Sequence, residues 1–213
     1  MKKIMIFDMD GVIIDSEPIH ESARQEMFLK YGIRPEEITI NPIGKSCSGY
    51  WADVLKAQNI QGDPLALQDE QYSRTADIIC QNQVPANPGM IEVLTWCKEQ
   101  GIKVGLASSS TRVLVDRILE HLQIGSYFDA TVSGDEVSRK KPDPEIYRKV
   151  LEMTGMAPED AVAAEDSGSG IRAARAAGIY CCGYVNPTSG VQNLSEAEKV
   201  ITSLLQLKEV LGA

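Results

Sequence analysis

The sequence lacks three features that would each have indicated a particular class of protein. It has no long run of Lys or Arg, and its formal net charge of −9 argues against a nucleic-acid or anionic-membrane partner, whose phosphates attract clustered cations. It has no apolar stretch that approaches the roughly 20 residues needed to span a bilayer. Its N-terminal apolar run is too short for a signal peptide and is interrupted by Asp8 and Asp10. We therefore expect a cytoplasmic protein that binds neither nucleic acid nor a membrane. We also expect a monomer.

A zinc-type or disulfide-type cysteine pattern is also missing. The five cysteines form an odd set without any Cys-x-x-Cys spacing. Cys181 and Cys182 are adjacent in an apolar run, where neighbouring residues of a strand point to opposite faces, so we expect reduced and mostly buried thiols. Without internal repeats or low-complexity tracts, the 213 residues suffice for one sizeable core or for one domain with a smaller insert.

The most informative stretch lies near the start of the chain, where an apolar run of strand length ends in Asp8-Met9-Asp10-Gly11. Alternation along a strand would place Asp8 and Asp10 on one face, and open α/β sheets carry their active sites at the carboxyl ends of strands. Two close carboxylates repel each other unless a cation lies between them or one holds a proton. Our hypothesis is that Asp8 is a nucleophile, Asp10 its proton-transfer partner, and Mg²⁺ binds beside them. From this stretch alone, a strand that ends in a solvated acidic turn is the alternative.

From about residue 86 onward, strand-like and helix-like segments alternate. This alternation is typical of an α/β protein with a doubly wound parallel sheet and right-handed crossovers. The pattern predicts strands over 103–107, 127–132, 161–164, 179–185 and 199–201, and helices over 90–100, 111–121, 144–153, 168–177 and 203–211.

The segment 15–85 interrupts this pattern directly after the first strand. Ser16 is typical of a helix N-cap, Pro18 of a first helical turn and Gly32 of a helix end, which together predict a helix to about residue 31. The segment continues rich in helix and contains no convincing buried strand. We interpret 15–85 as an inserted α-helical cap domain on a catalytic core formed by 1–14 and 86–213, with hinges at 12–16 and 84–89.

Polar side chains recur where the predicted core strands end. Taken singly, such residues are usually turn, cap or solvated side chains. Together, at the ends of separate strands of one sheet, they suit a phosphate and a Mg²⁺ ion, which prefers hard oxygen ligands. The groups are Asp8 and Asp10, then Ser108-Ser109-Ser110, then Lys140-Lys141, then Glu165-Asp166.

These motifs resemble those of the haloacid dehalogenase-like (HAD) superfamily, in the subgroup that contains β-phosphoglucomutase and small phosphosugar phosphatases. The resemblance covers essentially the whole chain, and the ordered set of four motifs is highly specific. The motifs are Phe7-Asp8-Met9-Asp10-Gly11-Val12, Leu106-Ala107-Ser108-Ser109-Ser110, Lys141-Pro142-Asp143-Pro144, and Glu165-Asp166-Ser167 with Gly170-Ile171.

The resemblance implies a fold, a HAD-like Rossmannoid core with a cap, and a mechanism. Asp8 would attack phosphorus to form an aspartyl-phosphate, while Asp10 would protonate the leaving oxygen and later deprotonate the attacking hydroxyl. The second acid favours phosphoryl transfer, because the dehalogenase members lack the pair. The remaining implied roles are phosphate binding by Ser108 with Ser109 beside it, charge neutralisation by Lys141, and Mg²⁺ held by Asp8, Asp166 and the main-chain carbonyl of Asp10, with Glu165 supporting the metal through water.

The inserted segment carries the expected substrate determinants. His20 lies on the first helix of the insert, where β-phosphoglucomutase-like proteins carry a histidine that couples closure to acid–base chemistry; a structural histidine is the alternative. Ile43-Gly44-Lys45-Ser46 resembles the substrate-specificity loop, with Lys45 as a candidate phosphate contact. The mutase pattern places an arginine near Cys47, and this chain has none there. Arg74 could replace it, although nothing in the sequence places it at the site.

The missing arginine determines the functional ranking. A mutase must hold a bisphosphorylated intermediate, whereas a phosphatase needs one phosphate site and an attacking water. We favour a Mg²⁺-dependent phosphatase of a small phosphorylated metabolite such as a hexose phosphate. The alternative is a β-phosphoglucomutase that interconverts β-glucose 1-phosphate and glucose 6-phosphate. A non-catalytic interaction module on the same fold ranks third, because none of the expected essential residues is absent.

Overall fold

The computed structural model describes residues 2–40, 45–190 and 192–212, and within them the chain forms a parallel sheet of six strands. The strand order is β3-β2-β1-β4-β5-β6, so that β1 lies in the middle, where the order reverses. In such sheets, ligands bind outside the carboxyl ends of the strands at the reversal point. The strands are β1 (Ile4–Phe7), β2 (Lys103–Ala107), β3 (Ala130–Val132), β4 (Ala161–Glu165), β5 (Tyr180–Tyr184) and β6 (Lys199–Ile201).

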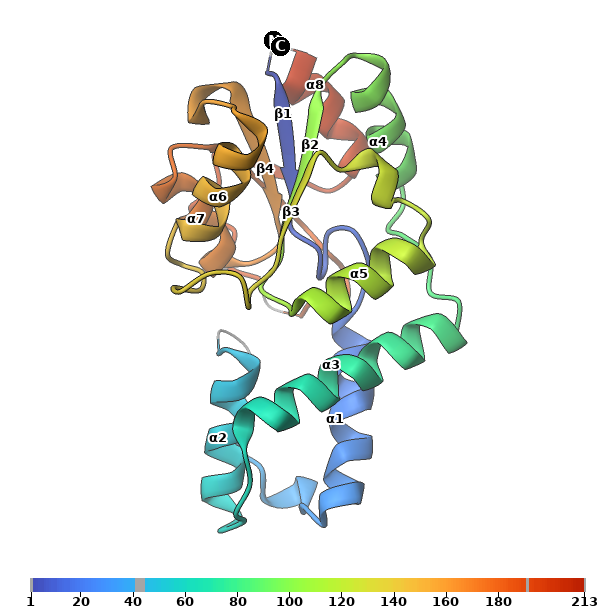
Figure 1. Cartoon of the computed structure of the whole chain (residues 1–213), viewed down its shortest axis with the longest axis vertical. Coiled ribbons are helices and arrows are strands. Elements are labelled where there is room, and N and C mark those ends of the chain that lie inside the picture. Colours follow the sequence, from blue (N-terminus) through green and yellow to red (C-terminus); the bar gives the residue numbers. More distant parts are fainter. Residues whose placement is uncertain (1, 41–44, 191, 213) are drawn as a thin grey trace.

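Helices cover both faces of this sheet (Figure 1), as predicted for a doubly wound fold. The side chains of β1 alternate between the two layers: Met5 and Phe7 join one buried cluster, and Ile4 and Ile6 the other. The first layer contains α4 (Met90–Glu99), α5 (Arg112–His121) and α8 (Leu207–Gly212), and the second contains α6 (Glu145–Thr154) and α7 (Gly168–Ala176).

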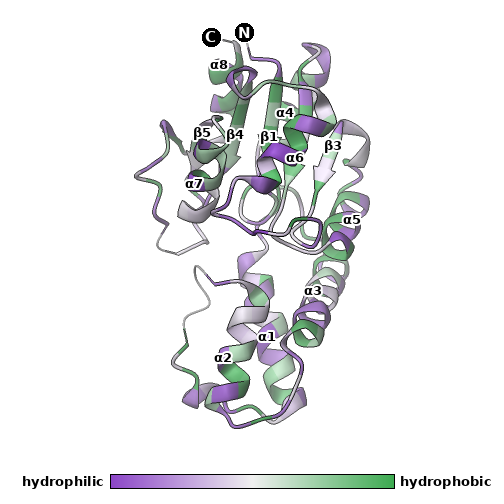
Figure 2. Ribbon diagram, turned by 60° about the vertical axis from the view of Figure 1, so that its left-hand side comes forward, coloured by the Kyte–Doolittle hydropathy of each residue, from purple (hydrophilic) through white to green (hydrophobic). Residues whose placement is uncertain are grey.

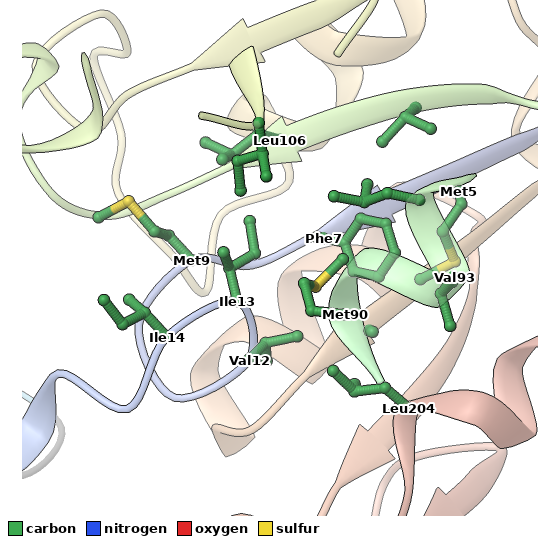
Figure 3. Packing of buried hydrophobic residues seen from close by; sticks show 14 of the residues in the cluster. Met5, Phe7, Met9, Val12, Ile13, Ile14, Met90, Val93, Leu106 and Leu204 are labelled. Carbon is green, nitrogen blue, oxygen red and sulfur yellow. The ribbon is translucent and has the colours of Figure 1, made fainter. Parts of the chain in front are cut away.

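The loop after β1 is anchored in the first layer. Figure 3 shows Phe7 beside Met90 of α4, with Val12 and Ile13 of the loop packed on the same cluster. These side chains are all fully buried. The turn that carries Asp8 and Asp10 therefore lies on a rigid base, which fixes where its carboxylates can point.

Three further helices lie together at the carboxyl-end side of the sheet, away from both termini (Figure 1). They have their own buried cluster, in which Trp51 packs edge-on against Phe28 and Tyr50. Figure 2 shows their apolar and polar residues intermixed, in contrast to the consistently apolar strand β1. The helices are α1 (Glu17–Tyr31), α2 (Cys47–Ala57) and α3 (Pro64–Gln81), with a 3₁₀ turn at Pro35–Glu37.

Two chain segments connect these helices to the sheet, and they run side by side. Ile14 pairs with Ala86 in an isolated antiparallel bridge, and the backbone N–H of Asn87 donates to the carbonyl of Ile13 at 2.8 Å. Both segments fall in the predicted hinges. The division into a core and a cap at residues 14/15 and 85/86 stays a prediction.

The sequence pattern predicted most elements to within two residues. The exception is β3: the strand predicted over 127–132 overlaps the last residue of a 3₁₀ turn at Gly125–Tyr127, and the observed strand begins only at Ala130. The final predicted helix is likewise divided into a 3₁₀ turn at Leu204–Gln206 and α8. None of the helices in the described ranges combines the length and the apolar character needed to cross a membrane.

Candidate functional site

Asp8 directly follows β1 and is joined to the sheet through its backbone, because its N–H donates to the carbonyl of Ala164 at 3.0 Å. Its side chain accepts a hydrogen bond of 2.6 Å from the ammonium of Lys141. The same ammonium donates to the carbonyl of Ala107 at 2.8 Å and to Oε1 of Glu165 at 2.5 Å. One buried lysine thus connects the ends of β1, β2 and β4.

Asp10 lies two residues further on and is held by three side chains. The hydroxyls of Ser16 and Ser110 donate to its two oxygens at 2.6 and 2.7 Å, and Nε2 of His20 lies 3.2 Å from Oδ1. Burial alone would raise the pKa of Asp10, but the hydrogen bonds from these groups and the charge of His20 lower it from its ordinary value. Asp10 is therefore held as a carboxylate in this arrangement.

Ser16 differs from its predicted role. It precedes α1 as expected, but its side chain makes no capping hydrogen bond and donates to Asp10 instead. An N-cap serine usually has an extended backbone, whereas Ser16 has φ −95° and ψ −13°, so its hydroxyl oxygen is not placed to accept from the N–H groups of the first turn. The start of α1 is therefore tied to the acidic turn.

His20 is buried between the two parts of the molecule. Its Nδ1 lies 3.1 Å from the hydroxyl of Thr75 on α3, which is fully buried. Because an ionised carboxylate only accepts hydrogen bonds, Nε2 carries a hydrogen toward Asp10, and in the neutral ring Nδ1 accepts from Thr75. The sequence analysis missed Thr75, because a lone threonine in an amphipathic helix gives no signal for such a contact.

Three carboxylates gather beside Asp8. One oxygen each of Asp8, Glu165 and Asp166 lie within 4.8 Å of one another. Burial, followed by the negative charge of Glu165, raises the pKa of Asp8 well above its usual range, and the same two causes raise that of Asp166 to about 7. The single ammonium of Lys141 does not neutralise this excess of negative charge.

The backbone leaves room for these carboxylates at two glycines. A Cβ on Gly11 would lie 2.1 Å from Oδ2 of Asp166, and one on Gly170 would lie 1.9 Å from Oε2 of Glu165. Gly11 also has a φ of +80°, which side-chain-bearing residues rarely adopt. An all-oxygen donor set, excess negative charge and this close approach fit a hard divalent cation such as Mg²⁺.

The two carboxylates at the end of β4 are not equivalent. Glu165 is fully buried, and its oxygens already accept from Lys141, Tyr147 and Ser167. Asp166 accepts at Oδ2 from the hydroxyl of Ser189 at 3.1 Å and from the amide of Gln192 at 3.5 Å, and among the described residues no donor occupies its Oδ1, which is therefore available to a ligand. Asp166 therefore suits direct coordination, and Glu165 suits the indirect support that we predicted.

A cavity of about 540 Å³ lies between the three helices and the carboxyl ends of the strands, which we call the sheet edge. Most of the predicted site residues meet in this cavity. Its wall includes Asp8, Asp10, Ser109, Lys141 and Asp166 from the sheet side, and Lys45 from the segment before α2. His20 reaches the same place through Asp10. Ser108 is fully buried behind this wall, where its hydroxyl accepts from the N–H of Ser110 at 3.0 Å.

The candidate cap determinants are only partly placed. Lys45 forms an ion pair with Asp53 at the cavity edge. Ile43 and Gly44 of the predicted specificity loop lie outside the described residues. Arg74, which could have replaced the missing arginine, pairs with Glu26 on α1 and is absent from the described lining of the cavity.

The chain is similar to several known proteins. The haloacid dehalogenase-like hydrolase family model matches residues 5–184. A phosphorylated carbohydrates phosphatase of Thermotoga maritima is 34% identical over 98% of this chain and 96% of its own length. The fructose-1-phosphate phosphatase YqaB of Escherichia coli is 32% identical over 82% of this chain and 92% of its own. The crystal structure of a β-phosphoglucomutase from Clostridium difficile superposes with a TM-score of 0.79 at 25% identity, covering 100% of this chain and 98% of that one.

Proposed function

The chain belongs to the haloacid dehalogenase-like hydrolase family, and from this membership and the geometry at the sheet edge we propose a Mg²⁺-dependent phosphatase of small phosphorylated metabolites, with hexose phosphates as the first candidates. The observation that carries the proposal is the contact of Asp8 with Lys141 in a cavity shared with Asp10. The similarity to phosphatases of phosphorylated carbohydrates supports the substrate class.

In the first step, an oxygen of Asp8 attacks phosphorus and the ester P–O bond breaks, leaving an aspartyl-phosphate. The leaving oxygen takes a proton from Asp10. Because the hydrogen bonds of Asp10 lower its pKa, Asp10 must take up this proton from solvent or from the incoming phosphate monoester before the step. The ammonium of Lys141 offsets negative charge on Asp8 and on the phosphoryl oxygens.

In the second step, a water attacks the phosphorus and Asp10 takes its proton. The P–O bond to Asp8 breaks and inorganic phosphate leaves. The lowered pKa of Asp10 suits this step, because a carboxylate is the required form of a base.

Asp8 and Asp166 would hold Mg²⁺ directly, with the carbonyl of Asp10 as a further ligand and Glu165 acting through water. When bound, the ion would neutralise charge on the phosphoryl group. Ser109 on the cavity wall and Lys45 opposite are the proposed phosphate contacts. Ser108 would join them once its hydroxyl, which here is buried and accepts from the N–H of Ser110, turns toward the cavity.

We propose that the segment 15–85 acts as a cap that selects the substrate. His20, Lys45 and Tyr72 approach the cavity or Asp10 from this segment, whereas the reacting groups all belong to the sheet side. Closure of such a segment excludes water and completes a pocket. This division would allow one chemistry to serve different substrates.

A substrate panel tests the proposal. Phosphate release is measured with Mg²⁺ over hexose phosphates, pentose phosphates, polyol phosphates, nucleotides and phosphoglycolate. We expect release from one or more sugar or polyol phosphates. Conversion of β-glucose 1-phosphate to glucose 6-phosphate with little free phosphate would instead establish the mutase alternative, which the structural likeness to a β-phosphoglucomutase keeps in view. No turnover of any ester would contradict both.

A further inference from the structure

Tyr147 on α6 lies beneath the candidate site and has no part in the mechanism above. It is fully buried, and its hydroxyl donates to Oε1 of Glu165 at 2.5 Å. The face of its ring lies 5.3 Å from the ammonium of Lys141, a distance at which a cation and an aromatic ring attract each other. One side chain thus contacts both partners of a buried ion pair.

The ammonium of Lys141 has three hydrogens and three oxygen acceptors. Two acceptors are fixed by the sheet: the carbonyl of Ala107 and the carboxylate of Glu165, the last residue of β4. The third is Asp8, the proposed nucleophile. Because the lysine side chain is only 4% exposed, water does not compensate for any of these contacts.

Glu165 competes with Asp8 for the charge of Lys141. Its Oε1 accepts from both Lys141 and Tyr147, so the phenol satisfies part of the carboxylate and weakens its pull on the ammonium. Burial and the charge of Glu165 raise the pKa of Tyr147 far above its usual range, so the phenol keeps the proton that it donates.

We propose that Tyr147 is a positioning residue, which holds Glu165 and the ammonium of Lys141 so that Lys141 remains bonded to Asp8. This inference rests on the proposed phosphoryl-transfer function, because it assigns Tyr147 a role in aligning the nucleophile. The hydroxyl sets how the ammonium is shared between the two carboxylates, and the ring supplies a π face 5.3 Å from the ammonium.

Tyr147→Phe isolates the hydroxyl, since phenylalanine keeps the ring that fills the core. Without the phenol, Oε1 of Glu165 depends on Lys141 alone and draws the ammonium away from Asp8. We expect kcat to fall about tenfold, with KM within about twofold of the wild-type value, the range expected for loss of one hydrogen bond to a charged group. The Kd for Mg²⁺, measured by calorimetry without substrate, should stay equal or become tighter, because the number of carboxylates is unchanged and Glu165 loses a hydrogen bond that offset part of its charge.

Tyr127→Phe is the matched control. The hydroxyl of Tyr127 shares a hydrogen bond of 3.3 Å with Thr95, and both residues lie outside the candidate site. This variant should retain the wild-type kcat, KM and Kd for Mg²⁺. A fall in kcat of the same size in both variants would show a general packing effect and would overturn the proposal.

A crystal structure of Tyr147→Phe tests the positioning independently of activity. The distance from Nζ of Lys141 to Oδ1 of Asp8, 2.6 Å here, should lengthen beyond hydrogen-bonding range while the backbone is unchanged. An unchanged distance, or wild-type kcat in the variant, would overturn the inference. A weaker Kd for Mg²⁺ at unchanged kcat would also overturn it, because it would place the effect on the metal. An inactive wild-type protein would contradict the proposed function. The distance from Lys141 to Asp8 in the variant would still show whether Tyr147 positions Lys141.

Discussion

The sheet edge and the three-helix segment use charge in opposite ways. At the edge, the side chains of Lys141, Asp8 and Glu165 are at most 10% exposed and pair with one another. On the helices, pairs such as Lys30 with Glu70 and Arg74 with Glu26 join side chains that are 34–59% exposed. Exposed pairs contribute about 0–1 kcal/mol, whereas burying a charge costs several kcal/mol that only close partners offset. The buried charges at the sheet edge therefore cost folding free energy and are not explained by a contribution to stability. This supports a chemical role for them.

The largest expected effect concerns the edge. Asp8→Asn removes the attacking oxygen and leaves an amide of the same shape beside Lys141. We expect kcat to fall by about 10⁴-fold or more, as for other lost nucleophiles. Steady-state phosphate release on the best substrate measures this, and the melting temperature shows whether the fold is retained. Substantial turnover by this variant would remove Asp8 as the nucleophile.

Each region contains a glycine of similar backbone conformation, and alanine substitutions at these two positions allow the regions to be compared. Gly11 and Gly32 have φ values of +80° and +64°, so alanine is strained at both, by about 1 kcal/mol. Only at Gly11 would the new Cβ meet Asp166; at Gly32, nothing in the described part of the chain lies within 4 Å of it. We expect Gly11→Ala to weaken Mg²⁺ binding by about 10- to 100-fold, as when other groups around metal ligands are disturbed.

Gly32→Ala is the control for this experiment. It should lower the melting temperature slightly and leave the Kd for Mg²⁺, measured by calorimetry, unchanged. Equal loss of Mg²⁺ affinity in both variants would mean that strain alone, and not the approach of Asp166, accounts for the effect.

The two regions also differ in how far the sequence predicted them. At the edge, strands of continuous apolar residues end in acids and serines, and the register of parallel strands brings these ends together. Lys141 lies in the segment between β3 and α6, and it was predicted from its motif and not from a strand end. The residues that support them were missed. Tyr147 fits the apolar face of an amphipathic helix, and its hydroxyl contact depends on tertiary packing that periodicity does not encode. Ser189 lies in a loop without any motif, yet contacts Asp166.

In the helical segment, the sequence predicted helices but not their contacts. The helix of Glu17–Tyr31 was predicted from Pro18 and Gly32, which act locally. The partner of Arg74 depends on how α3 packs against α1, so the sequence could not show that Glu26 would accept from it. Local signals thus determine element type, whereas long-range packing determines which side chain serves which site.

The effect of Mg²⁺ on the stability of the protein should depend on pH, because Mg²⁺ and protons bind the same carboxylates at the sheet edge. Asp166 has a pKa of about 7 in the folded metal-free protein against an ordinary value of 3.8. A raised pKa means that the folded state holds the proton more tightly, so its contribution to stability is present at low pH and is lost as the pH rises from about 4 to about 7. Mg²⁺ competes with that proton.

We therefore expect the metal to raise the melting temperature more at pH 8 than at pH 5.5. At a Mg²⁺ concentration of about 100 times Kd, the stabilisation at pH 8 should be about 3 kcal/mol. Differential scanning calorimetry in Mg²⁺ and in EDTA measures both values. An equal or larger shift at pH 5.5 would contradict a metal site built on Asp166.

We expect the smallest effect from substitutions of two cationic residues in the helical segment. Lys45 lines the cavity and its side chain is 42% exposed, whereas Arg74 is bound to Glu26 away from it. Lys45→Met should raise KM about three- to tenfold with little change in kcat, because a contact made equally to substrate and transition state affects binding alone. Arg74→Met should leave both constants within about twofold. If Arg74→Met raised KM instead, Arg74 would act as an arginine clamp for a second phosphate, and this would favour a mutase. If neither variant changed KM, selection of the substrate would depend on uncharged contacts of the helices, and the contrast with the charged sheet edge would be sharper still.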